Sequence, residues 1–594
     1  MRSSLLLVVT ALAVLLIGIW GCAEIAPVHR EEVVLEIELA SSSGDTVPAT
    51  ITRAKSVEAI PFWVEYEVSG LAEDATVVWM MERPIPQEDP TTQEVEGTSA
   101  RFVSPSNAWD HTVEIRVTMD DELYRWQEIL DFPLHNQTAI LLDAFQFGAT
   151  PEDAVTWSAS NGDPDDESTF PIADGASAQA KLVSQWPNVL DVSCQIEEED
   201  GTASEHDTQA LIYFKDGTPF ETRSVASTQH KPMPAEQLEE ILDQEFEQLR
   251  SLGVNTITTS INWYFGPPDD DGNWTIHPIW EERDAWPHDP RGDTVLDSDF
   301  ESLVSRAHEE GFHVHVQLRQ WPYKNDPDIE WSRTTFEHTF RTTDEFLYGA
   351  GQGYQNMLLY YLDDFVRLGV EFVYLGLENE GVERNGSNEM RSFYRFIIQQ
   401  YRDAGFLGGI SYANSVFGDH FLEWFPRELL VPGASGIPYE AMDAVASTFY
   451  PVLFEQPGAS TSTLQSQVRT YTDEFFQPRT AAFALPTIIE DCYSFAYGDC
   501  AMQPITHGDR PREEECSRRY HNAILREFAR ANTESDAPWI TCMTMAEYKI
   551  MADTYVRDFY RDGIVAYPWL NESAGRVPLQ LAIKTFFSDK PMGE

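Results

Sequence analysis

From about residue 217 onward, the chain alternates short apolar runs with segments whose apolar residues recur at helical spacing. The runs are rich in β-branched and aromatic residues, as in buried strands, and they lie near residues 221–227, 255–261, 313–319, 372–377, 409–414, 444–449, 485–489 and 538–543. Strand and helix in strict alternation favour a parallel sheet. Eight such strands, with a closing helix expected near Leu579–Phe587, predict an α/β fold: a (β/α)8 TIM barrel over residues 217–594.

The preceding region has a different pattern. Short alternating strands separated by Gly, Pro, Asp and Ser turns run from Glu32 to about Asp131, and a second β-rich stretch continues to Phe214. This pattern predicts one or two all-β, immunoglobulin-like sandwiches, drawn at residues 34–135 and 136–216. We interpret them as spacers, with carbohydrate binding as the alternative.

The first 22 residues have the layout of a secretory signal. Arg2 precedes an apolar run from Leu5 to Ile19, and Gly21 precedes Cys22, as at a lipoprotein cleavage site. We therefore expect a lipoprotein signal peptide over residues 1–22, lipidation of Cys22 and a tether over residues 23–33. An ordinary signal peptide is the alternative. The protein is then exported, and is either anchored to the cell surface or a periplasmic membrane face, or secreted.

The charge of the chain is strongly acidic. It contains 98 acidic and 40 basic residues, for a net charge of −58, and only 8 of the basic residues are Lys. Acidic residues spread along the whole sequence are typical of a halophilic protein, whose hydrated carboxylates maintain solubility in high salt. Nucleic acid is excluded as an expected partner, because phosphate contacts need clustered Lys and Arg.

Two glutamates mark the chemistry. The fourth run leads into Asn379-Glu380, and the seventh ends at Glu490. The carboxyl ends of barrel strands meet at one face, so the two side chains are expected on facing sides of one cleft. Retaining glycosidases use such a pair: a nucleophile and a general acid/base about 5 Å apart. We expect Glu490 to be the nucleophile and Glu380 the acid/base; Glu378, one layer deeper by strand alternation, is the competing choice.

The combination of Asn379-Glu380 on strand four, Tyr450 on strand six and Glu490 on strand seven resembles clan A of the glycoside hydrolases. The resemblance implies that Tyr450 hydrogen-bonds the nucleophile. The Tyr412-Ala413-Asn414 and Glu490–Ser494 segments are similar to those of the family 113 endo-β-mannanases, and Phe449-Tyr450-Pro451 is similar to the family 53 endo-galactanases. The resemblance implies hydrolysis of a β-linked polysaccharide or oligosaccharide through a glycosyl-enzyme intermediate, without a cofactor. It also implies a set of substrate-binding residues: Gln317, Arg319, Asn379, Tyr412, Asn414, Tyr450 and Tyr493.

Two departures leave the sugar open. Strand four reads Leu-Glu-Asn-Glu where family 113 has Gly-Thr-Glu, and strand eight lacks the usual Trp at its sugar-binding end. Trp263 and Trp321 follow strands two and three, where they could stack on sugar rings or pack loops. Cys492 and Cys500 could form a bridge or remain buried thiols, and no Cys or His spacing indicates a metal. We expect a monomer. The alternatives to hydrolysis are a non-catalytic carbohydrate-binding surface lipoprotein and a transglycosylase acting on the cell's own exopolysaccharide.

Overall fold

The computed structural model divides into two compact units, residues 1–215 with 591–594 and residues 216–590. It describes residues 30–56, 59–72, 74–83, 91–104, 111–120, 122–130, 135–136, 139–160, 170–181, 188–198, 201–213, 218–227, 246, 249–250, 252–266, 275–278, 297–322, 347–348, 353–377, 388–418, 432–451, 453, 460–492, 514–535, 537–548 and 583–587. The predicted signal peptide and Cys22 lie outside these ranges and stay predictions. Among the described residues, no helix combines the length and the apolar character that a membrane crossing requires.

The first unit consists of three β-sheets whose strands are mostly antiparallel, as the alternating pattern predicts. Its eight-stranded sheet has the order β6 (Thr91–Glu96), β5 (Thr76–Arg83), β8 (His111–Met119), β9 (Glu122–Leu130), β1 (Arg30–Ser41), β2 (Thr46–Ser56), β4 (Phe62–Ser69) and β7 (Ser99–Ser104). A five-stranded sheet contains β10 (His135–Asn136), β16 (Ala203–Tyr213), β15 (Asn188–Glu197), β12 (Ala154–Ser160) and β13 (Phe170–Asp174). A three-stranded sheet contains β14 (Ser177–Lys181), β11 (Ala139–Asp143) and β3 (Ala59–Ile60).

The two halves of this unit repeat one arrangement. In the first half the Trp79 indole N–H donates to the Gly97 carbonyl at 3.1 Å, and in the second half Trp157 donates to Gly175 at 3.0 Å, across the same 18-residue separation. Both glycines have positive φ, 124° and 105°, which favours glycine. The halves are nevertheless joined, because β3 pairs with β11 and one hydrophobic cluster contains residues of both. They therefore form one all-β unit, where the sequence predicted one or two sandwiches.

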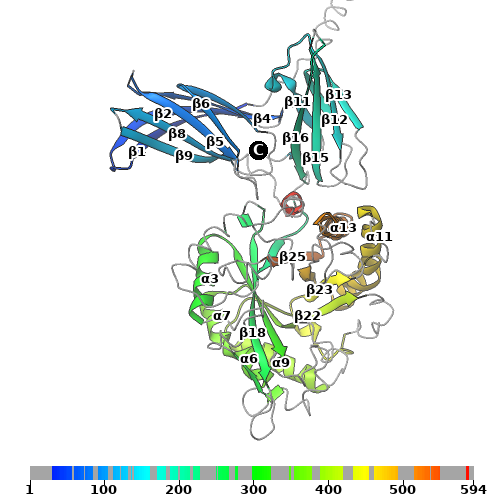
Figure 1. Ribbon diagram of the computed structural model, residues 1–594. Helices are drawn as coiled ribbons and strands as arrows, with labels where there is room; N and C mark the ends of the chain where they lie inside the picture. Colours follow the sequence, from blue (N-terminus) through cyan, green and yellow to red (C-terminus); the bar gives the residue numbers. More distant parts are fainter. Residues whose placement is uncertain are drawn as a thin grey trace, which may run out of the picture. The chain divides into compact units, whose positions relative to one another are not determined.

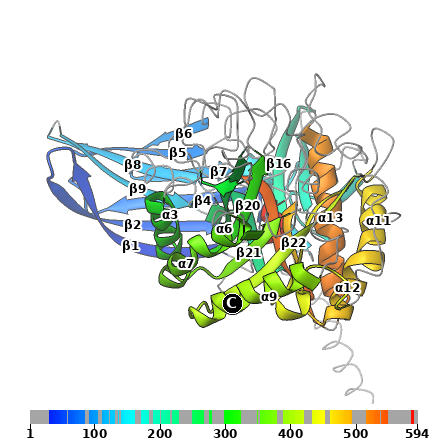
Figure 2. The ribbon, with the colours of Figure 1, turned by 90° about the horizontal axis from the view of Figure 1, so that it is seen from below.

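The second unit is a closed barrel of eight parallel strands, which confirms the predicted fold (Figures 1 and 2). In barrel order the strands are β17 (Thr222–Ser227), β18 (Thr256–Gly266), β20 (His313–Pro322), β21 (Phe372–Leu377), β22 (Gly409–Gly418), β23 (Val445–Pro451), β24 (Thr487–Cys492) and β25 (Ile540–Tyr548). Pairing of β17 with both β25 and β18 closes the ring. A short strand, β19 (Thr275–His277), adds an antiparallel extension to β18.

Helices surround the strands (Figures 1 and 2). They are α3 (Asp297–Glu309), α6 (Tyr354–Tyr360), α7 (Leu362–Leu368), α9 (Asn388–Asp403), α11 (Thr461–Tyr471), the π-helix η7 (Thr472–Phe476), α12 (Gln477–Phe483) and α13 (Glu514–Thr533). In α3 the buried face is an apolar stripe that includes Phe300, Leu303, Val304 and Ala307. Residues 583–587 are also helical and buried, within the stretch where a closing helix was expected. The Arg223 guanidinium of β17 donates to the Phe587 carbonyl there at 2.9 Å.

Glycine ends the segments that lead into four consecutive strands. Gly253, Gly311, Gly369 and Gly405 have φ between 74° and 88°. In each case the next residue donates its N–H to the carbonyl five residues back, as Phe312 does to Ala307 at 2.8 Å. This is the Schellman motif, which needs a left-handed residue that glycine adopts without strain. The repeated motif sets the direction in which the chain enters β18, β20, β21 and β22.

Candidate active site

The barrel sheet directs alternate residues of each strand inward. A cluster of buried residues fills part of this interior and is drawn from neighbouring strands: Tyr374, Ala413, Ala444, Ala446, Ile488 and Cys542. Because side chains alternate along a strand, the residues two positions beyond these members share their face. In β24 the cluster member is Ile488, and Glu490 follows one layer closer to the carboxyl end of the strand. The Glu490 charge acts on Tyr374 and Cys542 of this cluster, which indicates that its side chain is on the inner face.

Glu490 is a fully buried carboxyl group. Its exposed fraction is 0%, and it lies within β24 as the chain approaches the strand's end at Cys492. Its charge is felt by two inner neighbours, since it contributes to raising the pKa of Tyr374 and of Cys542, although burial is the largest cause for both. The side chain predicted as nucleophile is therefore at the carboxyl end of an inner strand face, where barrel enzymes hold their catalytic groups.

An ion pair lies beside this carboxyl group. The Arg319 Nη2 atom of β20 lies 3.3 Å from the Asp491 Oδ2 atom of β24, and the two side chains are only 8% and 4% exposed. Asp491 directly follows Glu490, and the register of β24 shifts against β25 between Ile489 and Cys492. Such a bulge re-aims side chains at the end of a strand. The inner face here therefore brings two carboxylates and one guanidinium together.

Other polar side chains line the same face of β20. Gln317, two residues before Arg319, is fully buried, and its Oε1 atom accepts a hydrogen bond from the Ser260 hydroxyl at 2.5 Å. His315 lies one layer deeper, with its Nδ1 atom 3.3 Å from the Tyr374 hydroxyl oxygen. Burial, with a contribution from His313, lowers the pKa of His315 to about 3, so its ring is neutral at ordinary pH. The predicted pair Gln317 and Arg319 thus lies in one polar column.

Tyr450 is the penultimate residue of β23 and belongs to its inner face. It is 4% exposed, and the preceding residue, Phe449, packs on the opposite face against Tyr471, Phe476 and Phe528. Alternation therefore turns Tyr450 away from the helices and toward the interior. This is the side on which its predicted contact with Glu490 requires it; the contact itself stays a prediction.

Three predicted substrate residues lie on the outer faces of their strands. Tyr412 packs edge-on against Tyr394 of α9, with ring centroids 5.6 Å apart. Asn414 accepts hydrogen bonds through Oδ1 from Ser447 at 2.7 Å and from a guanidinium of α12 at 2.5 Å. Trp263 is 1% exposed, and its indole N–H donates to the Tyr361 hydroxyl at 3.3 Å. These are contacts within the fold, and a sugar-binding role for the three residues stays a prediction.

The remaining predicted residues cannot be placed. Asn379, Glu380 and Tyr493 lie outside the described residues, as does the competing Glu378. The backbone of Trp321 belongs to β20, but its side chain is outside the described set. Strand β21 ends at Leu377, three residues before Glu380. Their roles therefore stay predictions.

Sequence reasoning missed several inner residues. Asp491 was not assigned a role, although its place directly after the predicted nucleophile was a usable signal. Ser260 and Tyr374 were missed because small hydroxyl and aromatic residues inside an apolar strand read as ordinary core. Cys492 is a free buried thiol here, as one of the two alternatives expected, and burial raises its pKa. Among the described residues, no three His, Cys, Asp or Glu side chains are grouped closely enough to share a metal ion.

Comparison with solved structures shows similarity to glycoside hydrolases. No protein-family pattern matches the chain, and no curated protein matches it. The chain is similar in structure to a family 113 β-mannanase from Alicyclobacillus acidocaldarius, with 14% identity and a TM-score of 0.42, over 62% of this chain and 97% of that one. It is also similar to a family 39 glycoside hydrolase from Bacteroides cellulosilyticus WH2, with 10% identity and a TM-score of 0.36, over 76% and 81% of the two chains. The chain is similar as well to a β-D-glucuronidase from Dictyoglomus thermophilum, with 9% identity and a TM-score of 0.33, over 90% of this chain and 97% of that one.

Proposed function

We propose that this protein is a retaining glycoside hydrolase that cleaves a β-linked polysaccharide through a glycosyl-enzyme intermediate, in the manner of an endo-β-mannanase. The observation that carries the proposal is the position of Glu490. It is a fully buried carboxyl group on the inner face of the seventh strand of a closed parallel barrel, near the strand's carboxyl end. The adjacent guanidinium and buried polar groups suit a carboxylate that must remain ionised.

The proposed mechanism has two steps that share one site. In the first, the Glu490 carboxylate attacks the anomeric carbon while Glu380 protonates the departing glycosidic oxygen. In the second, Glu380 takes a proton from water, which attacks the anomeric carbon and releases the sugar from Glu490. Asn379 is assigned to the sugar 2-hydroxyl and Tyr450 to the nucleophile, because both roles need a hydrogen-bonding side chain beside the reacting carbon.

The test is hydrolysis of a panel of β-mannans, galactans, glucans and xylans in molar salt. We expect wild type to cleave one polymer class, and Glu380→Gln to lose about 10²–10⁴-fold in rate, the usual contribution of a general acid/base. Glu490→Gln should lose at least as much, since no covalent intermediate can form. Glu309→Gln is the matched control: this α3 glutamate is 63% exposed and pairs only at the surface. Activity surviving in Glu490→Gln would remove the nucleophile assignment.

Stereochemistry tests the retaining mechanism independently of rate. Proton NMR of the first products should show the β-anomer before mutarotation, and a 2-deoxy-2-fluoro glycoside should label the peptide that contains Glu490. Release of the α-anomer first would establish inversion instead. Tight polysaccharide binding without cleavage would favour the non-catalytic lipoprotein, and products longer than the substrate in the presence of acceptor sugars would favour the transglycosylase.

A further inference from the structure

We propose that Asp491 is a positioning residue for the hydrolysis proposed above. Its carboxylate holds the Arg319 guanidinium across the barrel, so that a cation lies beside the neighbouring carboxylates of Glu490 and Asp491. The inference rests on the proposed function for its catalytic meaning. The charge balance itself can be tested without any activity.

The strand order shows that this ion pair spans the barrel interior. Between β20 and β24, the ring contains β21, β22 and β23 on one side and β18, β17 and β25 on the other. The two strands therefore lie on opposite sides of the barrel, and the 3.3 Å contact between Arg319 and Asp491 bridges its interior. An arginine is long enough for this reach, and its planar guanidinium keeps a fixed orientation once one carboxylate binds it. Asp491 thus determines where the positive charge lies relative to Glu490.

Because these three side chains are buried, a change in the charge of any one of them affects the others strongly. Arg319 and Asp491 are 8% and 4% exposed at their side chains, and Glu490 is 0% exposed. Charges removed from water are costly unless they are paired, and removal of one partner leaves the other uncompensated. Loss of Arg319 removes one positive charge from this group, loss of Asp491 removes one negative charge, and loss of both leaves the net charge as it is in wild type.

Several described titratable groups face these carboxylates or lie next to them. They are His315 of β20, Tyr374 of β21, Tyr450 of β23, Cys492 of β24 and Cys542 of β25. Burial is the first cause of each shift: it lowers the pKa of His315 to about 3, raises that of Cys542 to about 12, and raises those of Tyr374 and Cys492. A guanidinium does not titrate in this range. These pKa shifts favour the neutral forms of His315, Tyr374, Cys492 and Cys542.

The first experiment measures the acidic limb of the pH profile of kcat/KM, which reports the ionisation of the free enzyme's nucleophile. Arg319→Gln removes a positive charge from beside the two carboxylates, so its limb should move up by about one pH unit or more. Asp491→Asn should not move it up, and Arg319→Gln combined with Asp491→Asn should return it toward wild type. A merely structural role would lower activity at every pH without moving the limb. A limb that stays in place in Arg319→Gln, or that the second substitution fails to restore, overturns the proposal.

The second experiment uses thermal unfolding and needs no substrate. In Arg319→Gln the folded state should hold protons on Glu490 and Asp491 more tightly than the wild-type folded state does. The variant should therefore lose stability, relative to wild type, as pH rises from 5 to 8. Relative to wild type, the loss in Tm should be larger at pH 8 than at pH 5, and Asp491→Asn should recover part of it. Arg367→Gln is the control, since that arginine pairs with Glu301 where both side chains are 51% exposed. A wild type that cleaves no polysaccharide would contradict the proposed function. A Tm that Asp491→Asn does not recover in the Arg319→Gln background would contradict the charge balance.

Discussion

At the scale of single residues, Arg479 shows how a buried cation can be held without a carboxylate among its described contacts. The residue is 3% exposed, and its Nη1 atom donates to Asn414 at 2.5 Å, to Ser447 at 2.7 Å and to the Ala446 carbonyl at 3.2 Å. Its guanidinium also lies 4.4 Å from the centroid of the Tyr439 ring. A flat, multiply donating group suits this site, because it can stack and bond at once.

We expect Arg479→Lys to destabilise the barrel unit despite retaining the charge. An ammonium cannot stack as a plane while serving three acceptors, and each buried acceptor left unpaired costs about 1–3 kcal/mol. The loss of unfolding free energy should therefore reach about 2 kcal/mol, measured by denaturant unfolding. Arg367→Lys, at an exposed ion pair, should change it by less than about 1 kcal/mol. Equal effects of the two substitutions would show that the stacking geometry is unimportant.

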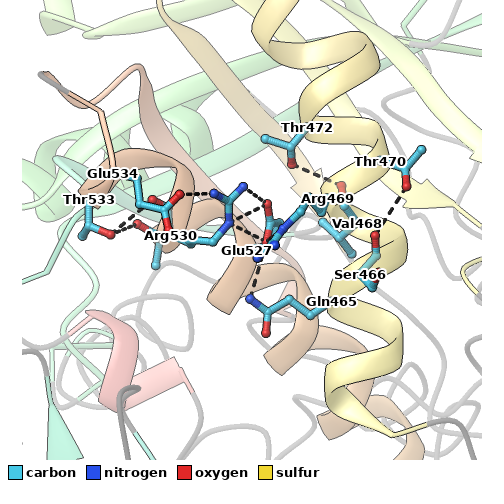
Figure 3. Close-up of polar contacts among 11 residues, drawn as sticks. Gln465, Ser466, Val468, Arg469, Thr470, Thr472, Glu527, Arg530, Thr533 and Glu534 are labelled. Carbon is cyan, nitrogen blue, oxygen red and sulfur yellow. Dashed lines mark hydrogen bonds and ion pairs between the residues drawn. The ribbon is translucent and has the colours of Figure 1, made fainter.

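At the scale of elements, Glu527 joins two helices outside the barrel. This α13 side chain is 0% exposed and accepts from Arg530 at 2.9 and 3.0 Å, from Arg469 of α11 at 3.3 Å and from Gln465 at 3.4 Å (Figure 3). Figure 3 shows the carboxylate between the two helices, with donors approaching from both. It also contributes most to raising the pKa of Arg530. The contact therefore couples α11, and the π-helix that continues it, to α13.

Glu527→Gln should loosen this pair of helices. The amide has one acceptor oxygen where the carboxylate has two, and its N–H groups face the guanidinium donors. Breaking a buried ion pair costs about 3–5 kcal/mol when neither partner can reach water. Arg469 is 48% exposed and can, so we expect about 2–3 kcal/mol. Glu534→Gln, at a carboxylate 62% exposed that also pairs with Arg530, should cost less than about 1 kcal/mol. Hydrogen exchange in α11 and α13 would locate the loss, and unchanged exchange in Glu527→Gln would contradict the coupling.

The comparison with sequence-based expectation also belongs at this scale. All eight barrel strands were predictable, because buried parallel strands are continuous apolar runs bounded by turns and helices. The side to which each end residue points was not predictable, since a shift of one position moves a side chain to the other face. Register shifts fall at the strand ends that carry the site, between Tyr374 and Leu377 and between Ile489 and Cys492. The place of Glu490 at the end of an apolar run could be anticipated. The outward turn of Asn414 and the ion pair of Asp491 could not, because they depend on strand register and on contacts between residues far apart in the sequence.

At the scale of the whole molecule, the dominant feature is the net charge of −58. Like charges spread over a compact surface repel one another, and unfolding relieves the repulsion by separating them. Salt shortens the screening distance from about 10 Å at 0.1 M to about 3 Å at 1 M. The same screening weakens surface ion pairs such as Arg367 with Glu301, but an exposed pair contributes only about 0–1 kcal/mol. With 98 acidic against 40 basic residues, relief of repulsion should outweigh the loss of pairs.

We therefore expect the Tm of the protein at pH 7.5 to rise steadily when KCl is increased from 0.05 M to 2 M. Each kcal/mol gained should raise it by about 2–4 °C, as in domains of 150–250 residues. The control is the same titration at pH 5, close to the sequence pI of about 4.4. Protonation removes part of the negative charge there, so the salt-dependent rise should shrink. A Tm that is independent of salt at pH 7.5, or that rises equally at both pH values, would show that charge repulsion does not limit stability, and would leave the acidic composition without the halophilic role that we assign to it.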